Sequence, residues 1–385
     1  MARTSNPRLF LTVLCVPMFL VLLDVLAMNV AMPALGRTFH IGREHWSLLV
    51  DAYTAPLAIG LLPAGWLVDR IGSRRALLGG LAVFAAASTL GAAGWSWESV
   101  LIARCVQGVA ASAMLPAGLA ALTTTWRAPA ERARALGTWS AVSAVATAVG
   151  PAVGGVLVAQ AGWRAVFWIN VPLALLALLG VSLLAPAGRP STERGGPSRP
   201  VALVVSVIAA AVMTSGANGM LQVLTVYLQD GLRLAAGPAG AVLLLATAPF
   251  VLLGPTTGPL VTRYGRCAVA AVGLVIGGVG LVSVGRLSGT LGLVPALLGI
   301  GVGLGLMSAA IVGETMAAWP ARPGFAGGLN NAMRQVGTSI GVVVGGGFTV
   351  HDAGPVVVRH AGVAAGAWWL GGAVLVLAGF SRRDR

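Results

Sequence analysis

The chain has 385 residues, of which 57% are hydrophobic and only 9% are charged. A soluble domain carries roughly 25% charged residues, so this composition excludes an ordinary water-soluble fold. The net charge of +14 does not indicate nucleic-acid binding, because the arginines lie in short segments between apolar runs. Membrane proteins concentrate positive charge in such segments on their cytoplasmic side.

Long apolar runs predict membrane-spanning helices. A helix needs about 20 residues to cross a bilayer. Three apolar runs reach or exceed this length: Leu9–Met32, Ala76–Gly94 and Val201–Leu228. The runs are continuous rather than alternating, which favours a helix bundle over a closed barrel. In chain order we predict about twelve spans, at residues 9–32, 47–67, 76–94, 98–122, 134–160, 164–185, 201–228, 238–262, 267–286, 290–318, 324–350 and 357–380.

The first run, Leu9–Met32, follows Arg3 and Arg8, as the apolar region of a signal peptide would. It is too long for that region, has no small-residue cleavage site and is followed by further spans, so we interpret it as the first membrane helix. Most arginines fall on one side of the predicted spans, which predicts that both termini face the cytoplasm.

One segment, residues 186–200, is rich in Pro, Gly, Ser and Arg and has no apolar periodicity. Such a composition predicts a cytoplasmic linker. We expect it to separate an N-terminal six-helix bundle, residues 1–185, from a C-terminal six-helix bundle, residues 201–385.

A weak internal repeat supports this division. The pattern G-x-L-x-x-R-x-G begins at Gly65 and again, 193 residues later, at Gly258. The same offset relates Gly108 to Gly301. Parallel six-helix repeats are a known plan of transporters, which place their substrate cavity between the halves near the bilayer midplane.

The segment after the second predicted span, GWLVDRIGSRR from Gly65 to Arg75, resembles the signature of the major facilitator superfamily between its second and third helices. The resemblance implies a gating and conformational motif made of Gly65, Asp69, Arg70, Gly72, Arg74 and Arg75. We expect Asp69 to lie at the N-terminus of a neighbouring helix and to pair with an arginine, while the glycines allow close packing. An ordinary positively charged loop is the alternative.

The fourth predicted span contains Arg104-Cys-Val-Gln107-Gly108, which resembles the R-x-x-Q-G motif of the same superfamily. An arginine in hydrocarbon costs about 2.5 kcal/mol or more, so Arg104 is expected to face a cavity or a partner. A role in proton handling and a structural role, bonding main-chain carbonyls, both remain open.

The fifth predicted span contains Gly150-Pro151-Ala-Val-Gly154-Gly155, which resembles the motif of antiporters in the superfamily. Where the family pattern has a further glycine, this chain has Ala146. Pro151 is expected to bend the helix, and the glycines to let another helix approach closely. Generic glycine-rich packing is the alternative.

Two further segments, around Asp24 in the first span and around Trp163 before the sixth, resemble signatures of the drug:proton antiporter branch. In the first segment the usual hydroxyl residue is replaced by Leu26. That branch usually has fourteen helices, and the linker at residues 186–200 is too short for two extra spans. The chain therefore resembles a twelve-helix relative.

Depth along the helices suggests a proton site. With a rise of about 1.5 Å per residue, Asp24, Asp51 and Arg104 fall at similar depths in the outer half of the N-terminal bundle. An ionisable residue inside the membrane is a functional candidate. We expect Asp24 to take a proton from outside and release it inside, with Arg104 tuning the exchange and Asp51 as a lesser candidate. A purely structural Asp24–Arg104 ion pair is the alternative.

Polar residues in several spans are candidates for lining a substrate cavity. Asn330, Arg334 and Thr338 share one face of a helix by their spacing of four residues. The full predicted set is Met28, Gln107, Asn218, Gln222, Asn330 and Arg334. Interhelical hydrogen bonding or ordinary packing explains the same residues, and Glu314 near a span end is expected to have a structural role.

The function that these patterns favour is proton-coupled export of small hydrophobic molecules, such as drugs or secreted metabolites, across a bacterial plasma (inner) membrane. A proton symporter or facilitator that imports a nutrient is the first alternative, and a membrane enzyme or receptor the second. No metal-binding or catalytic cluster is visible in the sequence. We therefore expect no enzyme activity, no metal, no cofactor beyond the proton gradient and no nucleic-acid partner, and we expect a monomer in the lipid bilayer.

Overall fold

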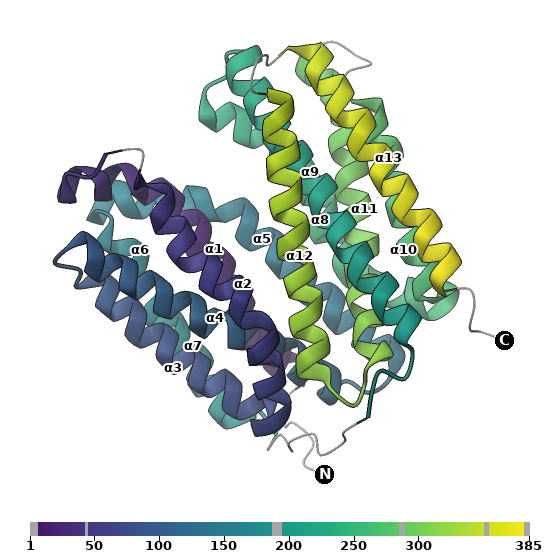
Figure 1. Cartoon of the computed structure of the whole chain (residues 1–385), viewed down its shortest axis with the longest axis horizontal. Coiled ribbons are helices and arrows are strands. Elements are labelled where there is room, and N and C mark those ends of the chain that lie inside the picture. The colour runs from purple at the N-terminus through teal and green to yellow at the C-terminus, as the bar shows by residue number, and fades with distance from the viewer. Residues whose placement is uncertain (1–6, 43–44, 187–194, 285–288, 350–353, 381–385) are drawn as a thin grey trace. The chain divides into compact units, whose positions relative to one another are not determined.

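The computed structural model describes residues 7–42, 45–186, 195–284, 289–349 and 354–380. Within these ranges the chain is helical and contains no strand (Figure 1). The α-helices are α1 (Pro7–Phe39), α2 (Ser47–Ile71), α3 (Ser73–Ala92), α4 (Trp97–Thr125), α5 (Pro129–Ala161), α6 (Arg164–Trp168), α7 (Asn170–Leu184), α8 (Pro200–Val226), α9 (Ala236–Leu253), α10 (Thr257–Ser283), α11 (Gly289–Ala318), α12 (Pro323–Thr349) and α13 (Pro355–Phe380).

Ten helical stretches in the described ranges are long and apolar enough to cross a membrane. α6 and α7 together form one of these stretches, Arg164–Leu184. The apolar part of α9, Pro238–Leu253, is shorter than a full span. α12 is long but is not among the ten; it carries the polar residues Asn330, Asn331, Arg334 and Gln335. The predicted all-helical membrane fold is confirmed, and the side on which the termini lie stays a prediction.

Several predicted boundaries are wrong: α1 continues to Phe39 rather than ending at residue 32, and α5 begins at Pro129 rather than at residue 134. The sequence suggested a span from 238 to 262, but α9 ends at Leu253, a 3₁₀ turn covers Gly254–Thr256, and α10 starts at Thr257. Pro255 explains the break, because proline has no N–H to continue the helical ladder. The loop expected at 263–266 is reduced to a single non-helical residue, Gly265, inside α10.

Contacts divide the chain into two compact units. Unit 1 consists of Met1–Thr125, Val142–Gly195 and Ala321–Asn331, and unit 2 consists of Trp126–Ala141, Gly196–Pro320 and Ala332–Arg385. Residues of α5 and α12 are thus shared between the units. The bundles expected at 1–185 and 201–385, with the linker between them, remain a prediction, since residues 187–194 lie outside the described ranges.

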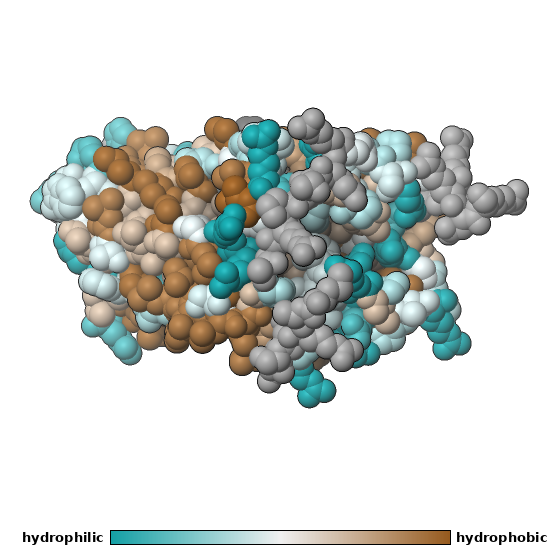
Figure 2. Space-filling model, turned by 90° about the horizontal axis from the view of Figure 1, so that it is seen from below, coloured by the Kyte–Doolittle hydropathy of each residue, from teal (hydrophilic) through white to brown (hydrophobic). Residues whose placement is uncertain are grey.

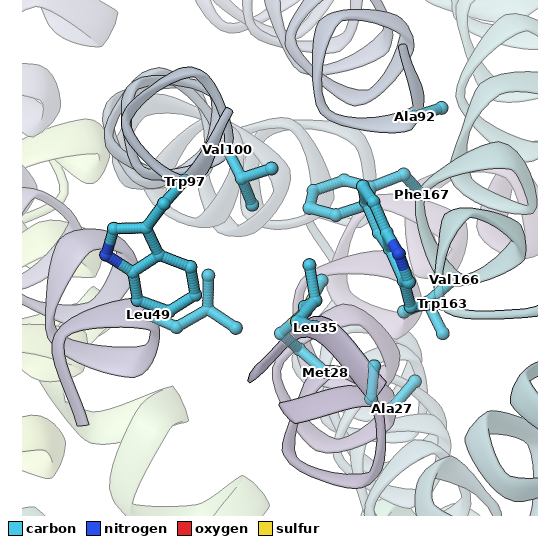
Figure 3. Packing of buried hydrophobic residues seen from close by; sticks show 11 residues of the cluster. Ala27, Met28, Leu35, Leu49, Ala92, Trp97, Val100, Trp163, Val166 and Phe167 are labelled. Carbon is cyan, nitrogen blue, oxygen red and sulfur yellow. The ribbon is translucent and has the colours of Figure 1, made fainter. Parts of the chain in front are cut away.

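The apolar core of unit 1 includes a cluster at one end of its helices (Figure 3). Met28 and Leu35 of α1 are fully buried there against Leu49, Trp97 and Phe167, which come from α2, α4 and α6. The aromatic rings of Trp97 and Phe167 and the aliphatic side chains fill the space between these four helices. This packing fixes α1 against α4 just beyond the turn that carries Asp24.

Many large apolar side chains point outward. Ile59 of α2 is 77% exposed, Leu183 of α7 is 73% exposed and Val343 of α12 is 73% exposed. Figure 2 shows such residues gathered in broad brown areas beside hydrophilic ones. A helix surface of this kind is stable when it faces lipid, because the backbone groups are already satisfied within the helices.

The internal repeat is also present in the backbone. Gly72 has φ 90° and Gly265, 193 residues later, has φ 80°, a region that favours glycine. A side chain at Gly108 would meet the carbonyl oxygen of Tyr53, and one at Gly301 would meet that of Ala246. These two contacts are again related by the same offset, so both copies use glycine for the same close approach of two helices.

Candidate functional site

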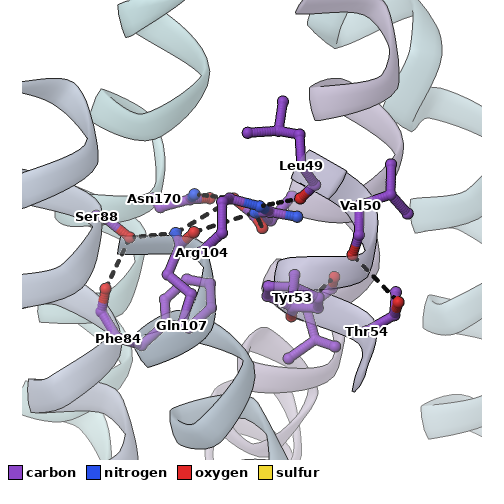
Figure 4. Close-up of polar contacts among 11 residues, drawn as sticks. Leu49, Val50, Tyr53, Thr54, Phe84, Ser88, Arg104, Gln107 and Asn170 are labelled. Carbon is purple, nitrogen blue, oxygen red and sulfur yellow. Dashed lines mark hydrogen bonds and ion pairs between the residues drawn. The ribbon is translucent and has the colours of Figure 1, made fainter. Parts of the chain in front are cut away.

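Asp24 lies at the centre of a buried polar network in unit 1. Figure 4 shows its partners Arg104, Gln107 and Asn170. Its side chain forms an ion pair with Nη1 of Arg104, and both residues are almost completely buried, at 1% and 0% exposure. The same Arg104 nitrogen donates to Oε1 of Gln107 at 3.0 Å. Since Arg104 and Gln107 are three residues apart on α4, one helix face presents both to the acid.

Neutral donors complete the surroundings of the carboxylate. Asn170, the first residue of α7, donates from Nδ2 to Oδ1 of Asp24 at 2.5 Å. Nε2 of Gln107 lies 3.4 Å from the same oxygen and 2.9 Å from the hydroxyl oxygen of Ser88. Asp24 is therefore held by groups from α4 and α7, and a chain of polar groups continues to α3.

Arg104 is positioned by α2 as well. Its guanidinium lies 4.3 Å from the centre of the Tyr53 ring, within the range of a cation–π interaction. Nε of Arg104 donates to the carbonyl oxygen of Leu49 at 3.4 Å. Nη2 is buried without a hydrogen-bond partner among the described residues. The Asp24–Arg104 ion pair is thus contacted by residues of four helices, α1, α2, α4 and α7.

The ion pair links the packing of these helices to the negative charge on Asp24. If Asp24 takes up a proton, Arg104 loses its counter-charge in a site closed to water. An uncompensated buried charge costs about 3–5 kcal/mol. Such a free energy is large enough to favour a rearrangement of α1 against α4 when the protonation state changes.

The other residues expected near this site have different places. Asp51 is exposed and forms no ion pair within the described part of the chain. Gln107, expected in the substrate cavity, is hydrogen-bonded to Asp24 within this network. Met28 is fully buried in the apolar cluster of Figure 3. Their roles in coupling and substrate binding stay predictions.

The motif after α2 ties two helices of unit 1 together. Asp69, near the end of α2, accepts hydrogen bonds from the main-chain N–H groups of Gly324 and Phe325, at 2.6 and 2.9 Å. These residues begin α12, where N–H groups have no partner within the helix. A Cβ atom at Gly65 would lie 2.7 Å from the carbonyl oxygen of Gly324, so glycine allows this approach.

The arginines of the motif have separate contacts. Arg70 lies with its guanidinium 3.7 Å from the centre of the Trp66 ring. Arg74 donates to the carbonyl oxygen of Ser182 at the end of α7, at 2.7 Å. Arg75 is exposed. The expected position of Asp69 at a helix N-terminus is present, and the gating role of the motif remains a prediction.

The predicted antiporter motif packs α5 against α1. A Cβ atom at Gly154 would lie 2.7 Å from Cα of Ala27, and one at Gly150 would lie 2.7 Å from Cβ of Leu26. Gly155 has nothing within 4 Å of such an atom. α5 continues as a helix through Pro151. The two glycines therefore contact α1 within one turn of Asp24.

Hydrogen bonds connect several of the predicted cavity residues of unit 2 with their neighbours on α8 and α12. Asn218 donates to the carbonyl oxygen of Thr214 at 2.9 Å, and its Nδ2 lies 3.4 Å from Oγ1 of Thr338. The Thr214 hydroxyl donates to the carbonyl oxygen of Arg334 at 2.9 Å. Gln222, on the same helix as Asn218, is half-buried. These contacts join α8 to α12, as the hydrogen-bonding alternative expected.

Two further predicted cavity residues lie on α12. Asn330 is fully buried in the part of α12 that belongs to unit 1. Arg334 belongs to unit 2, and its Nη1 has no hydrogen-bond partner among the described residues. Whether either side chain contacts a substrate stays a prediction.

Sequence reasoning missed three members of the Asp24 network: Asn170, Ser88 and Tyr53. Asn170 was the one with a usable signal, since it is a polar residue inside an apolar segment just before Pro172. Ser88 and Tyr53 have no such signal, because a serine or a tyrosine is common in membrane helices.

An all-helical chain with this many apolar helices and a buried acid–arginine pair has the architecture of a polytopic membrane transporter. The sequence model of the major facilitator superfamily matches residues 14–342. The chain belongs to this superfamily.

Three proteins with similar sequences are resistance or export proteins. The tetracenomycin C resistance and export protein of Streptomyces glaucescens is 28% identical, over 88% of this chain and 75% of that protein. A multidrug resistance protein of Mycobacterium tuberculosis is 27% identical, over 85% and 73%. The methylenomycin A resistance protein of Bacillus subtilis is 38% identical, over 44% of this chain and 36% of that protein.

Solved structures show the same fold. The human organic anion transporter MFSD10 superposes with a TM-score of 0.81 over 97% of this chain and 100% of its own, at 14% identity. The major facilitator transporter FucP superposes with a TM-score of 0.75 over 95% and 98%, also at 14% identity. At this identity the likeness bears on the fold alone.

Proposed function

We propose that this protein exports small hydrophobic molecules, such as drugs or secreted metabolites, in exchange for protons. The observation that supports this proposal most directly is the buried Asp24–Arg104 pair with its amide and hydroxyl partners. A carboxylate that is closed off from water and balanced by one arginine is suited to carry a proton through a transport cycle.

A route from the proton to helix movement follows from the neighbours of Asp24. The next turn of α1 carries Leu26 and Ala27, which pack against Gly150 and Gly154 of α5. A shift of α1 that follows protonation must therefore change its contact with α5. This contact links the ionisable site to the predicted antiporter motif.

We infer the direction of transport from the relatives, whose names concern resistance and export. We propose the same direction here, across a bacterial plasma (inner) membrane. In this proposal the partners are a small-molecule substrate, protons and the lipid bilayer. The chain works as a monomer, without a metal, an organic cofactor or nucleic acid, and it catalyses no covalent reaction.

The test is growth of a drug-susceptible bacterium that expresses the chain, on a panel of toxic compounds, with and without a collapsed proton gradient. We expect increased resistance to at least one compound, which is lost when the gradient collapses. Everted membrane vesicles should then accumulate that compound when they are acidified inside.

Asp24→Asn is expected to abolish this accumulation while the protein still inserts into the membrane. Glu98→Gln, which changes an exposed carboxylate of α4 in the same way, is the matched control. Accumulation that persists in the Asp24→Asn variant contradicts the assignment of the proton site. Uptake into right-side-out cells driven by protons would favour the import alternative.

A further inference from the structure

The two copies of the internal repeat each pack against the start of a helix. In unit 1, Gly65 contacts the main chain of Gly324 at the start of α12. In unit 2, a Cβ atom at Gly258 would lie 2.9 Å from the main-chain nitrogen of Arg134, near the start of α5. Each unit therefore brings its repeat glycine to the N-terminal part of a helix.

The copies differ in the negative charge that they supply. In unit 1 the carboxylate of Asp69 accepts from the N–H groups at the start of α12. The residue 193 positions later is Thr262, and its hydroxyl donates to Gly258 of its own helix at 2.9 Å. The repeat of unit 2 therefore supplies no carboxylate to the start of α5 in the way that Asp69 supplies one to α12.

A polar pocket lies near the start of α5 in unit 2, where α5 faces α10 and α11. It has a volume of about 80 Å³, and its lining includes Pro129 at the start of α5 and Gly313 of α11. Three arginines also line it: Arg127, Arg132 and Arg266. A water molecule takes about 30 Å³ of liquid volume, so the pocket has room for a small oxyanion.

The arginines have little negative charge to balance them. Arg132 donates to the main-chain carbonyl oxygens of Trp126 and Arg127, at 3.0 and 3.1 Å. Arg266 shares the carboxylate of Glu314 with Arg199, at 2.9 and 2.7 Å. In the ranges that the structure covers, neither Arg127 nor Arg132 forms an ion pair.

The remaining acid in this region does not serve the pocket. Glu131 lies in the first turn of α5, but its side chain is exposed and it is not part of the lining. Like charges held together without a counter-charge raise the free energy of the folded state. An external anion would lower it.

We propose that this pocket binds a phosphate group, supplied by the headgroup of an anionic phospholipid or by a phosphate in solution. Guanidinium groups bind phosphate oxygens through paired hydrogen bonds, and the start of α5 adds a favourable dipole. The arginine distribution predicts that this end of the helices is cytoplasmic, and anionic lipids are abundant in that leaflet. The bound phosphate supplies negative charge near the start of α5, as Asp69 does at the start of α12, independently of what the protein transports.

The experiment measures the melting temperature of the full-length protein, purified in an uncharged detergent. Inorganic phosphate, dioctanoyl phosphatidylglycerol and dioctanoylglycerol, which has the same chains without phosphate, are titrated separately. A ligand that binds the folded state raises the melting temperature as its concentration increases. We expect a saturable increase with at least one of the two phosphate compounds and none with dioctanoylglycerol.

Arg132→Gln removes one guanidinium from the pocket without leaving a carboxylate unpaired. We expect it to raise the half-saturating concentration about tenfold, as for the loss of one charge-assisted hydrogen bond. Arg263→Gln is the matched control, because Arg263 is exposed on α10, the helix of Arg266, and is not part of the lining. It removes the same charge and is expected to leave the half-saturating concentration unchanged.

Gly313→Asp tests the pocket by filling it. A Cβ atom at Gly313 meets Cδ of Arg266 and Cδ1 of Leu136 only at 3.5 Å, an ordinary contact. The new carboxylate should raise the melting temperature without added anion and remove the response to phosphate compounds. This variant keeps the test decisive if Arg132→Gln does not fold.

The outcomes are distinct. A response to phosphatidylglycerol alone identifies a lipid headgroup, a response to inorganic phosphate alone identifies a soluble phosphate, and a response to both supports a site for the shared group. The proposal is overturned if neither compound acts, if dioctanoylglycerol acts equally, or if Arg132→Gln and Arg263→Gln behave alike.

Discussion

Oδ1 of Asp69 lies 2.6 Å from the main-chain nitrogen of Gly324, 255 residues further along the chain. Through this hydrogen bond, and the one from Phe325 to the other carboxylate oxygen, the end of α2 caps the start of α12. The interaction has the chemistry of an N-cap, but the acceptor comes from a different helix. It is the point at which the repeat motif of unit 1 meets a helix dipole.

Asp69→Ala should lower the stability of the protein by about 1 kcal/mol, the usual effect of removing an N-cap. Asp69→Asn should have a smaller effect, because the amide oxygen still accepts one hydrogen bond. Melting in detergent micelles measures both. Thr262→Ala is the control at the equivalent position of the second repeat, since its hydroxyl bonds only within α10. Equal melting temperatures for Asp69→Ala and Thr262→Ala would refute the capping role.

Asp24 and Arg104 should be strongly coupled in stability. Either Asp24→Asn or Arg104→Gln leaves one buried charge without its partner, which costs about 3–5 kcal/mol. The double variant leaves two neutral amides and should be destabilised by clearly less than the sum of the single variants. A double-mutant cycle of unfolding free energies tests this. Additive effects would mean that the two groups do not interact.

Glu314→Gln should have a smaller effect than Asp24→Asn, although Glu314 is only 3% exposed. Its two arginine partners, Arg199 and Arg266, are 32% and 29% exposed, so water can solvate them once the carboxylate is gone. We expect a loss of about 1 kcal/mol. Comparison of the two variants by thermal unfolding gives the ranking, and a reversed order would contradict this argument.

Gly154→Ala and Gly155→Ala form a matched pair on α5. The new Cβ atom at residue 154 would lie 2.7 Å from Cα of Ala27 and 2.9 Å from its carbonyl oxygen, whereas residue 155 has open space. Overpacking of this kind costs about 1–3 kcal/mol. Gly154→Ala should therefore reduce both stability and transport rate, and Gly155→Ala should leave them near those of the unchanged protein. A transport assay on both variants settles whether the α1–α5 contact matters.

The helices themselves could be predicted from the sequence with small errors, because hydrophobic length is a direct consequence of bilayer thickness. The predicted spans at 290–318 and 324–350 agree with α11 and α12 within one residue at each end. The error at α9 and α10 arose where Pro255 and Gly265 act on the backbone rather than on hydropathy. Such local breaks do not change the mean hydropathy of a stretch of sequence as long as a membrane span, so hydropathy cannot reveal them.

The site could be predicted only in part. The depth of a residue along its helix does not show which side of the helix it lies on, or which neighbouring helix it faces. Asp24, Arg104 and Asp51 were placed at similar depths, but Asp51 is exposed while the other two form an ion pair. Asn170 is at the same level on α7, and its approach to Asp24 depends on how α7 is rotated in the bundle. That rotation is set by packing against several helices at once.

The shared backbone conformation of Gly72 and Gly265 indicates how this chain arose in evolution. Their backbone angles, φ 90° with ψ 145° and φ 80° with ψ 159°, are nearly the same and belong to a region that essentially only glycine occupies. Asp69 has no acidic counterpart at residue 262, yet the turn three residues further on has kept its shape in both halves. This is the trace that tandem duplication of a half-length gene would leave: side-chain chemistry has diverged between the copies, while a backbone angle available to one amino acid has not.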